Sequence, residues 1–139
     1  MSLYVLDTDT LSLYRFGHAR VCQKVDAQSA TDLAVTVLTV EEQVSGWYNL
    51  LRKAKQPPQV ARAYQELAEA VQYCARWAIL PYSVPAIARY DSLRSLKLNV
   101  RKPDLRIAAV TLEHGGILVT RNLRDFQRIP NLTVENWAV

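Results

Sequence analysis

The chain has 139 residues, of which 50% are apolar and 22% charged, and this balance is typical of a folded globular protein and excludes a disordered one. The length suits one domain over residues 1–139, and the start, MSLYVLD, has neither the basic residues of a signal peptide nor the length of a membrane span. Cys22 and Cys74 are the only cysteines and form no C-x-x-C pair, so we expect a cytoplasmic protein without a zinc site or a membrane partner.

The net charge of +4 is unevenly distributed along the sequence. Six basic and two acidic residues lie between Arg89 and Arg106, and Arg121, Arg124 and Arg128 follow. Such clusters attract polyanions, since phosphate backbones bind Lys and Arg without regard to sequence. A solvated basic helix face is an equally good interpretation of the same residues.

The first part of the chain predicts a strand, two helices and a second strand. In chain order these are a buried strand over residues 3–6, a helix from residue 9 or 10 to 14, a weaker helix over 19–27 and a β-branched strand over 33–38. Thr39 then stands where the N-cap of the next helix is expected.

Two long helices are predicted in the middle of the chain. One apolar stripe at helical spacing consists of Val40, Val44, Trp47 and Leu51, with Glu42, Ser45, Gly46 and Asn49 on the other side. After Pro57 and Pro58, a second stripe consists of Val60, Tyr64, Leu67, Val71 and Cys74.

The remaining chain alternates strands with helices. We predict a short strand over 78–80, a helix from Pro85 to residue 96 or 98, a helix opened by Pro103 and Asp104, a strand over 117–120, a loop or short helix over 121–126 and a strand within 132–137. This alternation predicts an α/β fold of three layers, α/β/α, around a central and mostly parallel sheet.

Acidic residues recur at the ends of predicted strands or the starts of helices. Asp7 and Asp9 follow the first strand, Glu41 and Glu42 the second, and Asp125 the strand over 117–120. Singly, each suits a helix cap, a first turn or a turn. Because ligands bind at the carboxyl ends of parallel strands, the set together with Asp104 predicts a site for Mg²⁺ or Mn²⁺.

The stretch LDTDTL permits a second chemistry. It matches the D-x-D-x-T pattern of haloacid-dehalogenase-like phosphatases, in which Asp7 would be the nucleophile and Asp9 the general acid. The chain lacks the later Asp-Asp or G-D-x-x-x-D pattern of that family, so we rank a phosphatase third.

Three segments in order resemble the PIN-domain ribonucleases, particularly the VapC-type toxins of prokaryotic toxin–antitoxin operons. They are YVLDTDTLS, VTVLTVEEQVSG and DLRIAAVTLEHGGILVTRNLRDFQRIPNLTVENW. The resemblance implies a PIN-like fold and four acidic catalytic positions at Asp7, Glu42, Asp104 and Asp125. Glu42 is chosen over Glu41 because Gly46 completes the E-x-x-x-G spacing of that family.

The same resemblance implies the other parts of the site and its partners. Asp7 and Asp104 would hold Mg²⁺ or Mn²⁺, with Glu42 and Asp125 as further candidate ligands. Thr8, Thr120 and Asn122 match supporting positions, and Asp9, where asparagine is commoner, would cap the helix or support the pocket. Arg101, Lys102, Arg121 and Arg124 are candidate contacts to the RNA backbone. The family implies an endoribonuclease, a homodimer and a cognate antitoxin; the alternative is a non-catalytic PIN-like module that binds RNA or protein.

Overall fold

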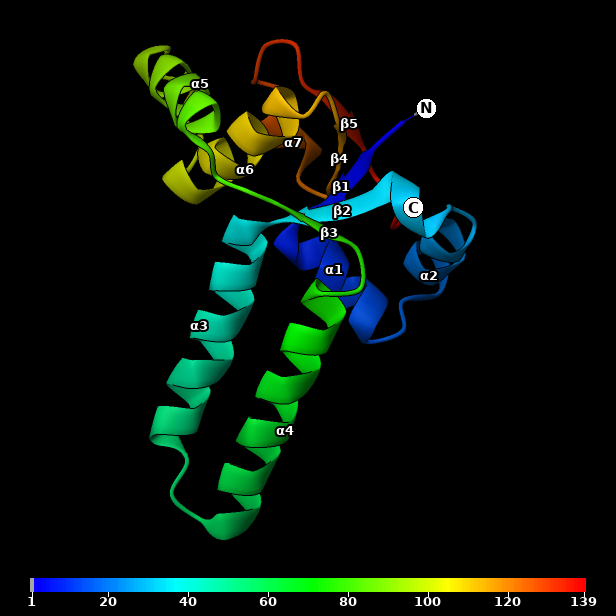
Figure 1. Cartoon of the computed structure of the whole chain (residues 1–139), viewed down its shortest axis with the longest axis vertical. Helices are drawn as coiled ribbons and strands as arrows, with labels where there is room; N and C mark the ends of the chain where they lie inside the picture. The colour runs from blue at the N-terminus through cyan, green and yellow to red at the C-terminus, as the bar shows by residue number, and fades with distance from the viewer. Residues whose placement is uncertain (1) are drawn as a thin grey trace.

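Five short strands form one parallel sheet in the computed structural model, which describes residues 2–139 (Figure 1). The strands are β1 Tyr4–Leu6, β2 Leu33–Thr36, β3 Ala78–Leu80, β4 Ile117–Val119 and β5 Thr133–Glu135. Their order in space is β3-β2-β1-β4-β5, and every neighbouring pair is parallel. The predicted parallel α/β architecture is therefore confirmed, and β1 lies at the centre of the sheet.

Seven α-helices and one short 3-10 helix connect the strands. They are α1 Thr8–Arg15, α2 Ala19–Asp26, the 3-10 helix Ala30–Asp32, α3 Val37–Lys53, α4 Pro57–Cys74, α5 Val84–Ser95, α6 Lys102–Glu113 and α7 Leu123–Phe126. Helices α3 and α4 form a long hairpin that extends away from the sheet (Figure 1). Within residues 2–139, no helix combines the length and the apolar character that crossing a bilayer requires.

The two faces of the sheet bury separate apolar clusters, because successive side chains of a strand point to opposite faces. Val5 of β1 packs with Leu118 of β4 in a cluster that includes residues of α5, α6 and α7. Leu6, the next residue of β1, packs with Val21 and Val25 of α2 on the opposite face. Helices therefore cover both faces and complete the predicted three layers. The prediction of a single domain over residues 1–139 stays a prediction.

The second strand ends two residues earlier than the sequence pattern predicts. Helix α3 begins at Val37, and its N-cap is Thr36, whose Oγ1 accepts a hydrogen bond of 3.2 Å from the backbone N–H of Thr39. The prediction of Thr39 as the N-cap is thus wrong. Thr36 ends the strand because its side chain replaces the missing helical acceptor, although Val37 and Leu38 have β-strand character.

The buried face of α4 also differs from the predicted stripe. Tyr64 and Val71 are 58% and 47% exposed, whereas Ala63 and Ala70 are buried together with Cys74. The helix therefore presents its small side chains inward, which permits a close approach to its neighbours. Two members of the predicted stripe, Tyr64 and Val71, were placed on the wrong face.

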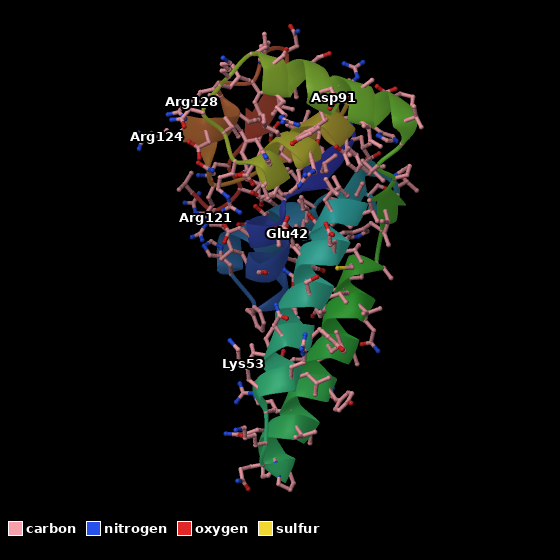
Figure 2. The ribbon with its side chains drawn as sticks, turned by 90° about the vertical axis from the view of Figure 1, so that its left-hand side faces the viewer. Glu42, Lys53, Asp91, Arg121, Arg124 and Arg128 are labelled. Carbon is pink, nitrogen blue, oxygen red and sulfur yellow. The ribbon has the colours of Figure 1, made fainter. Side chains whose placement is uncertain are left out.

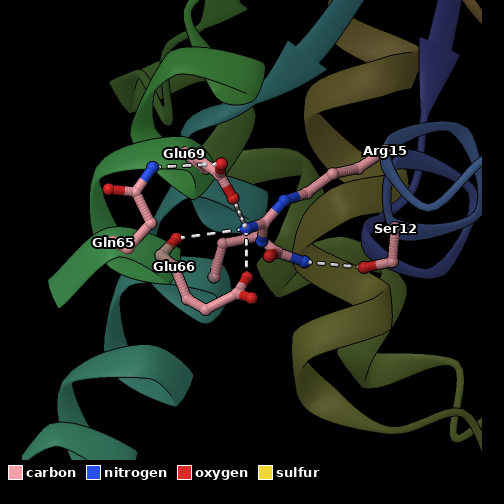
Figure 3. Close-up of polar contacts among 6 residues, drawn as sticks. Ser12, Arg15, Gln65, Glu66 and Glu69 are labelled. Carbon is pink, nitrogen blue, oxygen red and sulfur yellow. Dashed lines mark hydrogen bonds and ion pairs between the residues drawn. The ribbon is translucent and has the colours of Figure 1, made fainter. Parts of the chain in front are cut away.

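A buried arginine at the end of α1 contacts the middle of α4 (Figure 3). The side chain of Arg15 is 4% exposed, and its Nη2 donates to the carboxylate and the backbone carbonyl of Glu66 and to Glu69 Oε2 at 3.2 Å. Its guanidinium also lies 5.3 Å from the ring centre of Trp47 on α3. Arg15 thus contacts both helices of the hairpin.

Gly116 lies where α6 turns into β4, and the main chain there leaves no room for a side chain. The backbone N–H groups of Gly115 and Gly116 donate to the carbonyls of Leu112 and Thr111, and Gly115 has a φ of +63°. A Cβ at Gly116 would lie 2.9 Å from Val5 Cγ2 and 3.2 Å from the Leu3 carbonyl oxygen.

We predict that Gly116→Ala lowers the free energy of unfolding by about 2 kcal/mol, because the added methyl group overpacks the centre of the sheet. The matched variant Gly46→Ala, in helix α3 with nothing within 4 Å of its Cβ, should instead gain about 0.5 kcal/mol from helix propensity. Urea denaturation of both variants measures the difference. Equal stabilities would contradict the steric explanation.

Candidate active site

Asp7 lies at the carboxyl end of the central strand and is also the N-cap of α1. Its Oδ1 accepts a hydrogen bond of 2.8 Å from the backbone N–H of Thr10, and its own N–H donates to the carbonyl of Val119 at 3.0 Å. The residue is only 7% exposed. Burial raises the pKa of the Asp7 carboxyl group, while hydrogen bonds from Thr120 and Thr10 act in the opposite direction.

Glu42 lies on α3 and faces the same region as Asp7. Its Oε1 accepts a hydrogen bond of 3.0 Å from Thr8 Oγ1, which also lies 3.1 Å from Thr39 Oγ1. Partial burial raises the pKa of Glu42, and the negative charges of Asp104 and Asp7 raise it further. Thr8 therefore joins the start of α1 to the carboxylate on α3, as a supporting residue.

Asp104 lies in the first turn of α6 and is half-buried. Burial raises the pKa of Asp104, the guanidinium of Arg101 lowers it, and the charge of Asp125 raises it. Helix dipoles favour a carboxylate at this position. Asp104 is thus available to a ligand while its backbone stays in a regular helix.

One open cavity of about 480 Å³ brings most of the predicted residues together. Its lining consists of Asp7, Thr8, Asp9, Ser12, Glu42, Arg101, Asp104, Ile107, Arg121, Asn122 and Phe126. Figure 2 shows Glu42 in the middle of this side of the molecule, with Arg121, Arg124 and Arg128 grouped beyond it. Glu41, the neighbour of Glu42, is exposed and lies outside this lining. The cavity thus takes carboxylates from α1, α3 and α6 and the end of β1.

Asp9 is not the N-cap of α1, and its side chain pairs with Arg121. Both of its oxygens accept hydrogen bonds from Arg121, with Nε to Oδ2 at 2.7 Å and Nη2 to Oδ1 at 3.0 Å. Of the two expectations for Asp9, capping is wrong, since Asp7 is the cap and Asp9 lies two residues further on in the first turn. Support of the pocket by Asp9, which lines the cavity, stays a prediction.

Asp125 lies behind the wall of the cavity, in contact with Asn122. It lies in α7, outside the cavity lining, where its Oδ2 accepts a hydrogen bond of 3.0 Å from Asn122 Nδ2. Arg128 Nη1 lies 3.3 Å from the other oxygen. The backbone N–H of Asn122 in turn donates to Thr120 Oγ1 at 3.0 Å. These contacts fix Asn122 at the wall, and a metal-ligand role for Asp125 stays a prediction.

The donor set suits a hydrated divalent cation in its chemistry. The candidate ligand atoms in the cavity lining are carboxylate, hydroxyl and amide oxygens, and Mg²⁺ usually keeps several waters while using one or two carboxylates. Burial is the main cause that raises the pKa values of Asp7, Glu42 and Asp104, and the charge of Arg101 lowers those of Glu42 and Asp104. Among residues 2–139, no three acidic, histidine or cysteine side chains are close enough to enclose a metal ion directly.

The basic residues predicted to contact a polyanion divide into two groups. Arg101 and Arg121 line the cavity, whereas Lys102 and Arg124 are exposed beyond it. Ser12, which was not among the predicted residues, also lines the cavity and accepts a hydrogen bond of 3.0 Å from Gln43 Nε2. Its position four residues after Thr8 places both on one helical face, and this spacing was the available signal.

Comparison with known proteins places this architecture among its relatives. No model of a known protein family matches the chain. A Ribonuclease VapC2 of Haemophilus influenzae is 30% identical over 115 residues, which are 80% of each chain. A Ribonuclease VapC2 of Rickettsia felis is 35% identical over 69 residues, which are 47% of this chain and 52% of that protein. The crystal structure of VapBC2 from Rickettsia felis bound to a promoter DNA fragment matches with a TM-score of 0.76 and 25% identity, covering 97% of this chain and 98% of that chain.

The parallel sheet with acidic residues at the carboxyl ends of its strands defines a PIN-domain protein, as the sequence resemblance implies. Within that class, the extent of the match to the Haemophilus influenzae protein is sufficient to assign the family. The chain belongs to the VapC family of ribonuclease toxins.

Proposed function

We propose that the protein is a Mg²⁺- or Mn²⁺-dependent endoribonuclease that acts as the toxin of a toxin–antitoxin pair. The observation that carries the proposal is the convergence of Asp7, Glu42 and Asp104 on one cavity, each with a pKa raised chiefly by burial. Retaining such uncompensated carboxylates is unfavourable for folding, and functional sites commonly show this property. The VapC names of the relatives support cleavage of RNA as the reaction.

In this proposal Asp7 and Asp104 would hold the metal ion, and Glu42 faces the same cavity. A divalent ion bound there would supply an activated water and would neutralise charge on the scissile phosphodiester. The Thr10 N–H orients the Asp7 carboxylate, and the Thr8 hydroxyl orients that of Glu42. Arg101 and Arg121 bind phosphate oxygens at the cavity wall, where Asn122 fixes the edge.

The partners belong to the same proposal. The matching solved structures include VapBC2 from Rickettsia felis and a toxin–antitoxin complex from Klebsiella pneumoniae, which supports a cognate antitoxin for this chain. A homodimer and a single-stranded RNA substrate follow from the family alone. A cytoplasmic location is part of the same proposal, and the free thiols of Cys22 and Cys74 support it.

The two adjacent glutamates of α3 provide the test. With Mg²⁺ or Mn²⁺ we expect cleavage of RNA that is abolished by a chelator, and a loss of about 10- to 100-fold in Glu42→Gln. Glu41→Gln, which changes an exposed residue outside the cavity, should cleave as wild type does. Gel analysis of a labelled RNA pool, with metal titrated into chelator-treated protein, measures both effects.

Cleavage that persists in excess chelator would contradict the metal requirement. RNA binding without cleavage at any metal concentration would instead indicate the non-catalytic PIN-like module. A phosphatase is not favoured, because the general acid that it would need, Asp9, is bound through both oxygens to Arg121.

A further inference from the structure

An ion pair crosses the rim of the cavity between two elements that are far apart in sequence. Asp9, in the first turn of α1, and Arg121, directly after β4, form two parallel hydrogen bonds of 2.7 and 3.0 Å. This bidentate geometry fixes the plane of the guanidinium group as well as its position. Both residues line the cavity.

We infer that Asp9 is a positioning residue that holds Arg121 at the rim so that Arg121 binds a phosphate of the RNA. The inference rests on the proposed function, because it needs a polyanionic substrate at this cavity. Asp9 uses Nε and Nη2 of Arg121, and among residues 2–139 Nη1 has no hydrogen-bond partner. The Nη1 edge of the fork is therefore free to donate to phosphate oxygens.

The charge of the cavity explains why such a cation is needed. Four acidic residues line the cavity against two basic ones, Arg101 and Arg121. Before a metal ion binds, a phosphate backbone approaching this site meets net repulsion. A guanidinium fixed at the rim offsets that repulsion without entering the space between the carboxylates.

The backbone beneath Arg121 is well anchored on both sides. The N–H of Thr120 donates to the Glu135 carbonyl at 2.9 Å, and Thr120 Oγ1 accepts from the N–H of Asn122. The Arg121 side chain projects from this anchored backbone, and its two hydrogen bonds to Asp9 restrict it. The two side chains are 51% and 48% exposed, so the pair contributes little to folding stability. A role toward a ligand explains the pair better than a role in the fold.

A double-mutant cycle tests the inference through binding instead of cleavage. The full-length chain, wild type or variant, is titrated into a fluorescent single-stranded RNA of mixed sequence, in chelator and at several salt concentrations. In the wild-type background we expect Arg121→Ala to weaken RNA binding about tenfold and to lower the salt slope by about one. In the Asp9→Asn background the same substitution should weaken RNA binding about threefold or less. Arg20→Ala, an exposed change on α2, should bind as wild type does.

A lysine variant separates the charge from the geometry. Arg121→Lys should keep the salt slope of wild type, because the charge is retained. Adding Asp9→Asn to this variant should change its RNA affinity less than Asp9→Asn changes that of wild type, since lysine cannot form the two parallel hydrogen bonds. The melting temperatures of all variants should stay near that of wild type, which shows that they fold.

The sign of the coupling decides the result. If Arg121→Ala weakens binding more in the Asp9→Asn background than in wild type, Asp9 competes with RNA for Arg121 and the inference is overturned. Independent effects, or no RNA binding by wild type, also overturn it. Binding with the expected coupling but without cleavage in Mg²⁺ or Mn²⁺ would leave the positioning role standing and refute the proposed nuclease.

Discussion

Asp7→Asn should cut RNA cleavage in Mg²⁺ by more than about 100-fold and yet raise the melting temperature of the metal-free protein by roughly 3 °C at neutral pH. The amide keeps the oxygen that accepts from the Thr10 N–H, so α1 retains its cap. The substitution removes the ionisable carboxyl group that is buried at the carboxyl end of β1, the central strand. Catalysis and stability therefore respond in opposite directions to one substitution.

The pH dependence of stability gives an independent measure of the same residue. Because the folded pKa of Asp7 lies above its unfolded value, the folded state binds more protons, and stability falls as the pH rises from the ordinary aspartate range to the raised pKa. This decline should be smaller in Asp7→Asn. Asp91→Asn, an exposed change on α5, is the control and should follow wild type. A lower melting temperature for Asp7→Asn at neutral pH would contradict the account.

Arg15→Ala should lower the free energy of unfolding by about 3 kcal/mol, because it leaves the carboxylate of Glu66 without its partner in a largely buried position. Nη1 of Arg15 is itself buried with no hydrogen-bond partner among residues 2–139, so the desolvation of the guanidinium is incompletely offset. The contact therefore fixes α1 against the hairpin more than it adds net stability.

Urea denaturation of Arg15→Ala, Arg15→Met and Arg62→Ala separates the contributions. The methionine variant keeps much of the apolar packing against Trp47 and should lose less stability than alanine. Arg62, exposed on α4, should tolerate alanine with little change. Faster hydrogen exchange along α3 and α4 should accompany the loss of Arg15. Unchanged stability in the alanine variant would mean that water already solvates Glu66.

Much of the fold could be predicted because local signals agree with it. Alternating strands and helices, Pro57 at the start of α4 and the glycines after α6 all mark real boundaries. The end of β2 could not be located, because Val37 and Leu38 suit a strand and only the Thr36 side chain decides the cap. Which side of α4 is exposed also depends on the elements that the helix packs against. The residue type of Tyr64 does not indicate that its side chain is exposed.

The acidic residues of the candidate site could largely be predicted from the sequence, but the side-chain contacts that they make could not. Positions at strand ends were enough to select Asp7, and the E-x-x-x-G spacing to select Glu42, which the cavity includes while excluding Glu41. The pairing of Asp9 with Arg121 depends on β1 and β4 being neighbours, and no local pattern reveals it. Asp125 follows β4 as expected, but the turn of α7 directs it to Asn122 and Arg128.

The position of β1 in the sheet has a consequence for biosynthesis. Val5 pairs on one side with Ala34 but on the other with Leu118, a residue translated near the end of synthesis. Arg121 and Asn122, which form part of the cavity wall, leave the ribosome after most of the chain. The cavity is therefore still incomplete when most of the chain has emerged. The candidate active site of a nascent copy is thus incomplete until the last quarter of the chain has emerged.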